Sequence, residues 1–283
     1  MTSLTPASKN SVANLVQRAV IALTLGPLAL YLIYLGGYFY FVPLALILLL
    51  ATYEFTGLTL RIGWLVSVWL MLPAVAALYA VAQFFDPQFI PVVFAVALLA
   101  AMIHALWLYE SRSDGLALPT WSATVLGLVL LGWLASHFFL LRRLDTMAWQ
   151  WTMLMFLSTW FADSAAYVVG RFLAGNVLGK HPLSPRLSPN KTVEGFLGGM
   201  VLGSALTVGV AYLLGLPLTL AAGLGLLISS IGPFGDLGIS LLKREAGAKD
   251  SGRTFGSHGG ALDRVDSLIW SVTITFYLVT YLQ

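Results

Sequence analysis

The most chemically active part of this chain is the segment from Ser240 to Asp266, which concentrates charged side chains in an otherwise almost uncharged sequence. Just upstream, Asp236 stands inside an apolar run. Asp236, Ser240 and Arg244 recur at i, i+4 and i+8, so a helix would place a carboxylate, a hydroxyl and a cation on one face. The apolar run around Asp236 is interrupted in sequence by three glycines and a proline, which are Gly232, Pro233, Gly235 and Gly238.

A second carboxylate, Asp263, closes the same segment, immediately after the pair Gly259 and Gly260. Two carboxylates that flank a cationic, glycine-bearing loop have the chemistry that a divalent metal and a phosphate chain require. The simpler interpretation is an ordinary basic loop between membrane helices. That interpretation leaves Asp236 unexplained, because a charge deep in a membrane segment costs about 2.5 to 3.5 kcal/mol.

Another polar block lies earlier in the second half of the chain. Asp163, Tyr167 and Arg171 also recur at i, i+4 and i+8, so they share one helix face. The segment from Ser188 to Gly195 then offers hydroxyl, amide and ammonium donors next to a helix start, where phosphate oxygens bind well. An ordinary connector is the alternative, with Thr192 as the helix cap and Glu194 complementing the helix dipole.

Composition defines the class of protein that must position these residues. Apolar residues make up 59% of the chain and charged residues only 10%, against about 25% charged in soluble domains. The chain is therefore expected to be an all-α polytopic membrane protein. It contains no cysteine, which excludes disulfides, zinc–thiolate sites and cysteine nucleophiles.

Hydropathy predicts about nine transmembrane helices, each near the ~20 residues that cross a bilayer. They follow a cytoplasmic tail (residues 1–17) and divide into an N-terminal bundle (18–141) and a catalytic region (142–283) with cytoplasmic loops 171–192 and 243–264. The predicted spans are Ala19–Leu35, Tyr38–Leu60, Trp64–Phe85, Phe89–Tyr109, Trp121–Leu141, Ala148–Val169, Val193–Leu214, Leu216–Leu242 and Val265–Leu282.

Orientation follows from the lysines and arginines, which are retained on the cytoplasmic side. With the N-terminus inside, 13 of the 15 cations fall in cytoplasmic segments. Only Arg142 and Arg143 fall outside, and the C-terminus lies outside as well. Among the few polar groups in the N-terminal spans, Glu54 is expected to reach interfacial water, with a helix-packing or lipid-headgroup contact as the alternative. His104 and His137 are given no functional role.

The two polar blocks together resemble the phosphatidate cytidylyltransferases, also called CDP-diacylglycerol synthases. In that family a serine, a Lys-Arg pair, a Lys-Asp pair, His-Gly-Gly and Asp-Arg follow in this order, and the earlier block carries Ala-Asp, Ala-Tyr, Gly-Arg and Ser-Pro, Lys-Thr, Glu-Gly. The resemblance is dense from Phe161 to Asp266, whereas the first half matches only in hydropathy. The departures are Ala261, where the family has a larger apolar residue, and Gly256-Ser257, where it often has Pro-Gly.

The resemblance implies an enzyme that joins CTP to phosphatidate and releases pyrophosphate, with charge neutralisation as its main task. Its partners would be CTP and the membrane lipid, with no nucleic acid, and a homodimer is left open. Mg²⁺ is the expected cofactor, and a second, monovalent cation is left open. The implied location is a bacterial inner membrane, with the site facing the cytoplasm.

The roles that this resemblance implies fall into three groups. Asp236 and Asp263 are the expected metal ligands and count as catalytic groups, together with Lys243, Arg244 and His258. The expected substrate-binding residues are Ser188, Lys191, Thr192, Ser240, Lys249, Arg253, Gly259, Gly260 and Arg264. Supporting or additional metal-binding groups are Asp163, Glu194, Asp250 and Asp266.

Two rival functions are open from the residues alone. A secondary transporter would use carboxylates in interrupted spans to coordinate ions at mid-membrane. That reading accounts for Asp163 and Asp236 but gives the charged loop from Lys243 to Arg264 no task. A CTP-dependent transferase for a different lipid, such as an isoprenoid monophosphate or alcohol, keeps the chemistry and changes only the acceptor.

Overall fold

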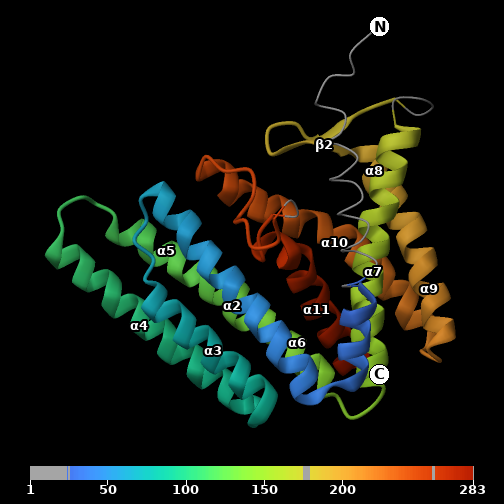
Figure 1. Ribbon diagram of the computed structural model, residues 1–283, viewed down its shortest axis with the longest axis horizontal. Helices are drawn as coiled ribbons and strands as arrows, with labels where there is room; N and C mark the ends of the chain where they lie inside the picture. The colour runs from blue at the N-terminus through green and yellow to red at the C-terminus, as the bar shows by residue number, and fades with distance from the viewer. Residues whose placement is uncertain (1–23, 25, 175–178, 257–258, 283) are drawn as a thin grey trace, which may run out of the picture.

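The computed structural model describes residues 24, 26–174, 179–256 and 259–282 and shows an almost entirely helical membrane protein (Figure 1). Within these residues, seven helices are long and apolar enough to cross a membrane. They are Gly37–Ile62, Pro87–Ser111, Ala117–Arg142, Ala148–Leu173, Val193–Leu213, Leu218–Glu245 and Leu262–Leu282. The shorter apolar helices Gly26–Leu35 and Val68–Phe84 coincide with two more predicted spans. The polytopic all-α class is thus confirmed, while nine membrane crossings stay a prediction.

The N-terminal helices form a bundle of closely packed hairpins. Helix α2 (Gly37–Ile62) packs against α3 (Val68–Phe84), which also contacts α4 (Ile90–Ser111) beyond the short turn η1 (Pro87–Phe89). The next span consists of α5 (Ala117–Gly127), the π-helical segment η2 (Leu128–Leu134) and α6 (Ala135–Arg142). Its large buried side chains, such as Phe138 and Phe139, fill the core of this bundle.

Arg142 and Arg143, the two exceptions to the cation pattern, bind the carboxyl ends of neighbouring helices. The Arg142 side chain donates to the carbonyls of Ile33 and Tyr34, at 2.9 and 3.2 Å. Arg143 donates to the carbonyls of Ala82 and Phe85, at 2.7 and 2.8 Å. Free carbonyls at a helix C-terminus carry partial negative charge and favour such cations. Both arginines therefore have a structural task that requires them at this end of the molecule.

The C-terminal part contains the remaining helices and a small hairpin. Helix α7 (Ala148–Val168) continues into the π-helical segment η3 (Val169–Leu173), and α8 (Val193–Gly198), η4 (Gly199–Gly203) and α9 (Ser204–Leu213) form the next span. Between η3 and α8 lie the strands β1 (Pro182–Ser184) and β2 (Ser188–Thr192), which pair antiparallel. The loop predicted over residues 171–192 thus holds a hairpin, whose turn contains Pro185. Figure 1 shows the hairpin away from the end of the bundle that holds the C-terminus.

A row of glycines brings the hairpin span against α7. Gly195, Gly199 and Gly203 recur every four residues, and a methyl group at any of them would lie 2.7 to 3.0 Å from Ala166 or Ala162. Such small-residue rows let two membrane helices approach backbone to backbone. This close approach places the start of α8, and the strand β2 before it, beside the polar face of α7.

Helix α10 runs without interruption from Leu218 to Glu245 and packs along α11 (Leu262–Leu282). The predicted span Leu216–Leu242 is thus a single helix despite its glycines and Pro233. A continuous helix keeps its backbone groups paired inside a membrane, and a single proline removes only one of those bonds. Gly235 has a packing role, since a methyl group there would lie 2.7 Å from the carbonyl of Asp266 on α11.

The charged loop is shorter than predicted, because α10 extends to Glu245 and α11 begins at Leu262. Asp263 and Arg264 accordingly belong to the first turn of α11 and not to the loop. An acidic residue at this position complements the helix dipole, which places positive partial charge at the N-terminus.

Candidate active site

A polar cavity of about 720 Å³ opens between α7, the hairpin, α8, α10 and α11. Its size lies within the range of small-molecule sites, about 300 to 1,000 Å³. Cations and carboxylates are balanced among the described residues that line it, with five of each. They are Arg171, Lys180, Lys191, Lys243 and Arg264, and Asp163, Asp236, Asp250, Asp263 and Asp266.

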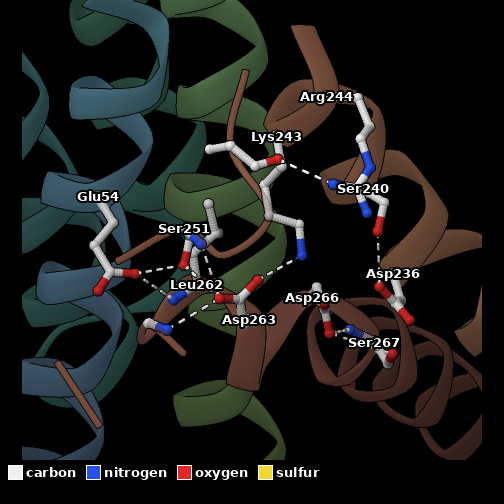
Figure 2. Close-up of polar contacts among 12 residues, drawn as sticks. Glu54, Asp236, Ser240, Lys243, Arg244, Ser251, Leu262, Asp263, Asp266 and Ser267 are labelled. Atoms are coloured by element: carbon white, nitrogen blue, oxygen red, sulfur yellow. Dashed lines mark hydrogen bonds and ion pairs between the residues drawn. The ribbon is translucent and has the colours of Figure 1, made fainter. Parts of the chain in front are cut away.

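Lys191 and Asp236 connect the hairpin to α10 across this cavity. Lys191 Nζ lies 2.7 Å from Asp236 Oδ2 and donates to the carbonyl of Pro233 at 3.2 Å. Ser240 Oγ donates to Asp236 Oδ1 at 3.2 Å, as the i, i+4 spacing predicts (Figure 2). Asp236 therefore holds one cation from a different polar block of the sequence.

Lys243 and Asp263 form the second ion pair, joining α10 to α11 (Figure 2). Lys243 Nζ lies 2.6 Å from Asp263 Oδ1, and the two side chains are only 10% and 8% exposed. Asp263 Oδ2 accepts hydrogen bonds from the Ser251 amide at 2.9 Å and the Gly260 amide at 3.0 Å. A buried ion pair with these additional donors is well compensated for the loss of water. Its geometry fixes the ammonium group at the cavity wall.

Three carboxylates, Asp163, Asp236 and Asp266, lie close enough to interact electrostatically. Asp266 is buried, and its Oδ1 accepts from the Ser267 amide at 2.7 Å. Magnesium prefers hard oxygen ligands and is usually held by one or two carboxylates together with water and substrate phosphates. In the described part of the chain no group of three or more acidic or histidine side chains forms a ready-made cage. The Asp236–Asp266 neighbourhood fits the more open kind of site.

Asp236 and Asp263, the expected pair of metal ligands, line the same cavity but hold different cations. Asp263 is engaged by Lys243, Ser251 and Gly260. Asp236 is engaged by Lys191 and Ser240 and also has Asp266 as a carboxylate neighbour. A centre shared by Asp236 and Asp263 stays a prediction.

Glu54 does not occupy the expected interfacial position and instead makes the packing contact that was the alternative. It is buried, with 8% of its surface exposed, and does not reach interfacial water. Its carboxylate accepts from Ser251 Oγ at 2.7 Å and the Leu262 amide at 3.0 Å (Figure 2). It also accepts from Thr254 Oγ1 at 2.6 Å. The available signal was the carboxylate itself, because an acid inside an apolar span is costly unless it has partners.

Several predicted residues line the cavity, and others support it from outside. Lys191, Thr192, Lys243, Arg264, Asp163, Asp236, Asp250, Asp263 and Asp266 line it. Arg244 instead donates to the carbonyls of Leu187 and Ala248, both at 3.3 Å, and so ties the hairpin to the charged loop. Lys249 and Arg253 are exposed, and Ser188 pairs with Ser184 in the hairpin. His258 lies outside the described residues.

The glycine pair and Glu194 serve local structure. Gly259 has a positive φ of 82°, and the Gly260 amide, expected to approach phosphate, donates to Asp263. Thr192 caps α8 by accepting from the Gly195 amide at 3.0 Å, as the connector interpretation predicts. Glu194 pairs with His181 at 2.5 Å. His137 is also structural, since its Nδ1 lies 3.1 Å from the carbonyls of Trp133 and Leu134.

Two cations that the sequence did not assign to the site also line the cavity. Arg171 and Lys180 line it, together with Tyr167 and Asn190. The helix face of Asp163, Tyr167 and Arg171 is confirmed, because all three side chains reach the cavity. The Arg171 guanidinium also lies 5.8 Å from the centre of the Tyr167 ring. Lys180 could not be placed from sequence, because its position depends on the hairpin that follows it.

The fold and the cavity define a polytopic membrane protein with a charged site, and comparison with known proteins gives the family. The profile of the cytidylyltransferase family matches residues 16–282, and the chain belongs to this family. It is 32% identical to the phosphatidate cytidylyltransferase of Synechocystis over 94% of this chain and 97% of that protein. It is also 32% identical to the enzyme of the same name from Brucella suis, over 93% of each chain. The Staphylococcus aureus enzyme is 40% identical over 117 residues, 41% of this chain and 43% of its own.

Proposed function

We propose that this protein joins CTP to phosphatidate, producing CDP-diacylglycerol and pyrophosphate for phospholipid synthesis. The observation that carries the proposal is the cavity of about 720 Å³ in which five cations face five carboxylates within an apolar helical protein. Relatives that match nearly the whole chain bear the name phosphatidate cytidylyltransferase. A transporter function would leave this concentration of phosphate-binding cations without a task.

The reaction needs no protein nucleophile. An oxygen of the lipid phosphate attacks the α-phosphorus of CTP, and the bond from that phosphorus to the bridging oxygen of the β-phosphate breaks. The bridging oxygen leaves with the electron pair as part of pyrophosphate. Because two anionic reactants must meet, catalysis depends on alignment and charge neutralisation. Lys191, Lys243 and Arg264 are positioned for both tasks along the cavity wall.

The ion pairs within the site keep these cations oriented before substrate arrives. Lys191 on Asp236 and Lys243 on Asp263 each retain hydrogen atoms that the carboxylate does not use, since an ammonium group has three donors. The remaining donors would bind phosphate oxygens. Arg171 and Lys180, which also line the cavity, would bind further oxygens of the triphosphate.

Asp236 and Asp266 would hold Mg²⁺, with Asp163 adding negative charge in the same cavity. When bound, Mg²⁺ would neutralise phosphate charge and assist the departure of pyrophosphate. Asp263 would then act through Lys243 by fixing the position of its ammonium group.

We further propose that the cavity faces the cytoplasm of a bacterial inner membrane, where CTP is available. The cation distribution supports this orientation. The structural roles of Arg142 and Arg143 account for the two cations that depart from it. All nine apolar helices would then cross the membrane, and a homodimer stays a prediction.

Purified protein incubated with CTP, phosphatidate and Mg²⁺ should release pyrophosphate and form CDP-diacylglycerol in equal amounts. Diacylglycerol, which lacks the attacking phosphate, should give no product and serves as the matched control. Turnover of an isoprenoid monophosphate in preference to phosphatidate would favour the rival lipid acceptor. Absence of CTP consumption with either lipid would contradict the proposed function.

A further inference from the structure

Glu54 connects the N-terminal bundle to the charged loop although 197 to 208 residues separate it from its partners there. Ser251, Thr254 and Leu262 all donate to its carboxylate, at 2.6 to 3.0 Å. Leu262 is the first residue of α11, so its amide is one of the donors that a helix leaves unpaired. Glu54 therefore caps α11 from another helix and also holds the loop that precedes it.

The same interactions reach the buried ion pair through Ser251. The Ser251 hydroxyl lies 2.7 Å from Glu54 Oε2 and 3.0 Å from Asp263 Oδ2. A hydroxyl donates one hydrogen atom, and the Ser251 amide already donates to Asp263 at 2.9 Å. The hydroxyl is thus available to Glu54 while the amide serves Asp263. One residue links the two carboxylates.

Two glycines of the charged loop leave room for the Glu54 carboxylate. A methyl group at Gly252 or at Gly260 would overlap the Glu54 carboxylate. The Gly260 amide donates to Asp263, so the close approach of Glu54 and the hold on Asp263 occur at the same residue. These two glycines are accordingly explained by Glu54.

We propose that Glu54 is a positioning residue for the transfer reaction, acting through Ser251 and the start of α11 on the Lys243–Asp263 pair. It does not line the cavity, so it acts on the reactants through other residues. The inference rests on the proposed function, because its effect is measured as cytidylyl transfer. Partners behind the groups that contact substrate typically change activity by about 10- to 100-fold when removed.

The hydrogen-bond donors around Glu54 predict which replacements of this residue retain activity. Glutamine at residue 54 keeps an acceptor for Leu262 and Ser251, and its amide can donate to Thr254, whose hydroxyl also accepts. Alanine removes all of these interactions. If Glu54 acts by hydrogen bonding, Glu54→Gln should keep at least about a third of the wild-type kcat, whereas Glu54→Ala should lose about 10- to 100-fold.

The experiment compares kcat and KM for CTP and phosphatidate in purified wild type, Glu54→Gln, Glu54→Ala and Glu110→Ala. Glu110 is an exposed carboxylate of α4, so its removal is the matched control and should leave both constants unchanged. We expect the loss in Glu54→Ala to fall on kcat, with KM changed by less than about threefold, because misplaced groups weaken the transition state.

A second pair of variants keeps the test decisive if Glu54→Ala is not recovered as folded protein. Thr254→Val removes one hydrogen bond to Glu54 and should lower kcat by about 2- to 10-fold. Thr254→Ser retains the hydroxyl and should behave as wild type. A wild-type protein without transferase activity would overturn the proposed function itself.

With an active wild type, three results would overturn the positioning role. They are full kcat in Glu54→Ala, full kcat in Thr254→Val, and loss in Glu54→Gln as large as in Glu54→Ala. The last result would mean that the negative charge, and not the hydrogen bonding, is what the site requires.

Discussion

Lys191 Nζ lies 2.7 Å from Asp236 Oδ2, which joins the hairpin before α8 to the middle of α10. The two residues come from polar blocks that are separated by a whole membrane span. Their side chains are 25% and 34% exposed, so the pair lies at the open part of the cavity and not in its buried wall. A phosphate group can therefore reach the ammonium of Lys191 without displacing the buried Lys243–Asp263 pair.

Replacing Lys191 should weaken the use of CTP more strongly than replacing any exposed cation away from the cavity. A hydrogen bond to a charged group contributes about 1.5 to 3 kcal/mol, so Lys191→Ala should lower kcat/KM roughly tenfold to hundredfold. Arg244→Ala should have a smaller effect, because Arg244 binds backbone carbonyls beside the cavity. Steady-state kinetics at saturating lipid measure kcat/KM for CTP in both variants.

Arg112→Ala is the control for charge removal. Arg112 Nε lies 2.7 Å from Asp114 Oδ2 on an exposed turn. Neither residue lines the cavity. Unchanged kinetics in Lys191→Ala would remove this residue from the site.

The magnesium requirement should depend on Asp236 and Asp266. Asp236→Asn and Asp266→Asn should each raise the Mg²⁺ concentration for half-maximal activity by about tenfold or more, since each would remove a charged oxygen from the proposed metal site. Asp263→Asn should lower kcat through Lys243 without moving the Mg²⁺ requirement. Titration of activity with Mg²⁺ in each variant is the measurement.

Asp86→Asn provides the matched control, because Asp86 is an exposed helix cap that asparagine can replace. A raised Mg²⁺ requirement in Asp263→Asn would instead support the pair predicted from sequence, Asp236 with Asp263.

Membrane orientation can be tested directly because the chain contains no cysteine. Arg186→Cys in the hairpin turn and Glu245→Cys at the end of α10 are exposed positions that should react with a membrane-impermeant thiol reagent only from the cytoplasmic side. Thr146→Cys, in the connection between α6 and α7, should react only from the opposite side. Ser251 is unsuitable as a reporter, because it is buried and bonded to Glu54. The reverse labelling pattern would refute the orientation.

The packing of η4 on α7 should tolerate no added methyl group at Gly203. A β-carbon there would lie 2.9 Å from the Ala162 backbone, and overpacking typically costs about 1 to 3 kcal/mol. Gly203→Ala should therefore lower the melting temperature of the purified protein in detergent. Gly209→Ala, in the same span but with no neighbouring atom within 4 Å, should leave it unchanged or raise it. Equal melting temperatures would show that the helices separate easily.

The sequence by itself determined the membrane class, most helix positions and much of the cavity lining. Hydropathy marks helices because backbone groups in a membrane must pair within their own segment, so local composition decides. The helix face of Asp163, Tyr167 and Arg171 and the bond from Ser240 to Asp236 also follow from local spacing. Periodicity is a property of a single helix and needs no partner.

Tertiary structure decided which groups meet. Pro233 lies inside α10 without ending it, because backbone groups inside a membrane must stay paired. Glu54 could be recognised as an unusual acid, but its partners Ser251, Thr254 and Leu262 depend on how α2 packs beside α11. The pairing of Lys191 with Asp236 likewise requires the close approach of glycine-rich helices. Such contacts join distant segments through packing, so they cannot be predicted from the spacing of residues along one segment.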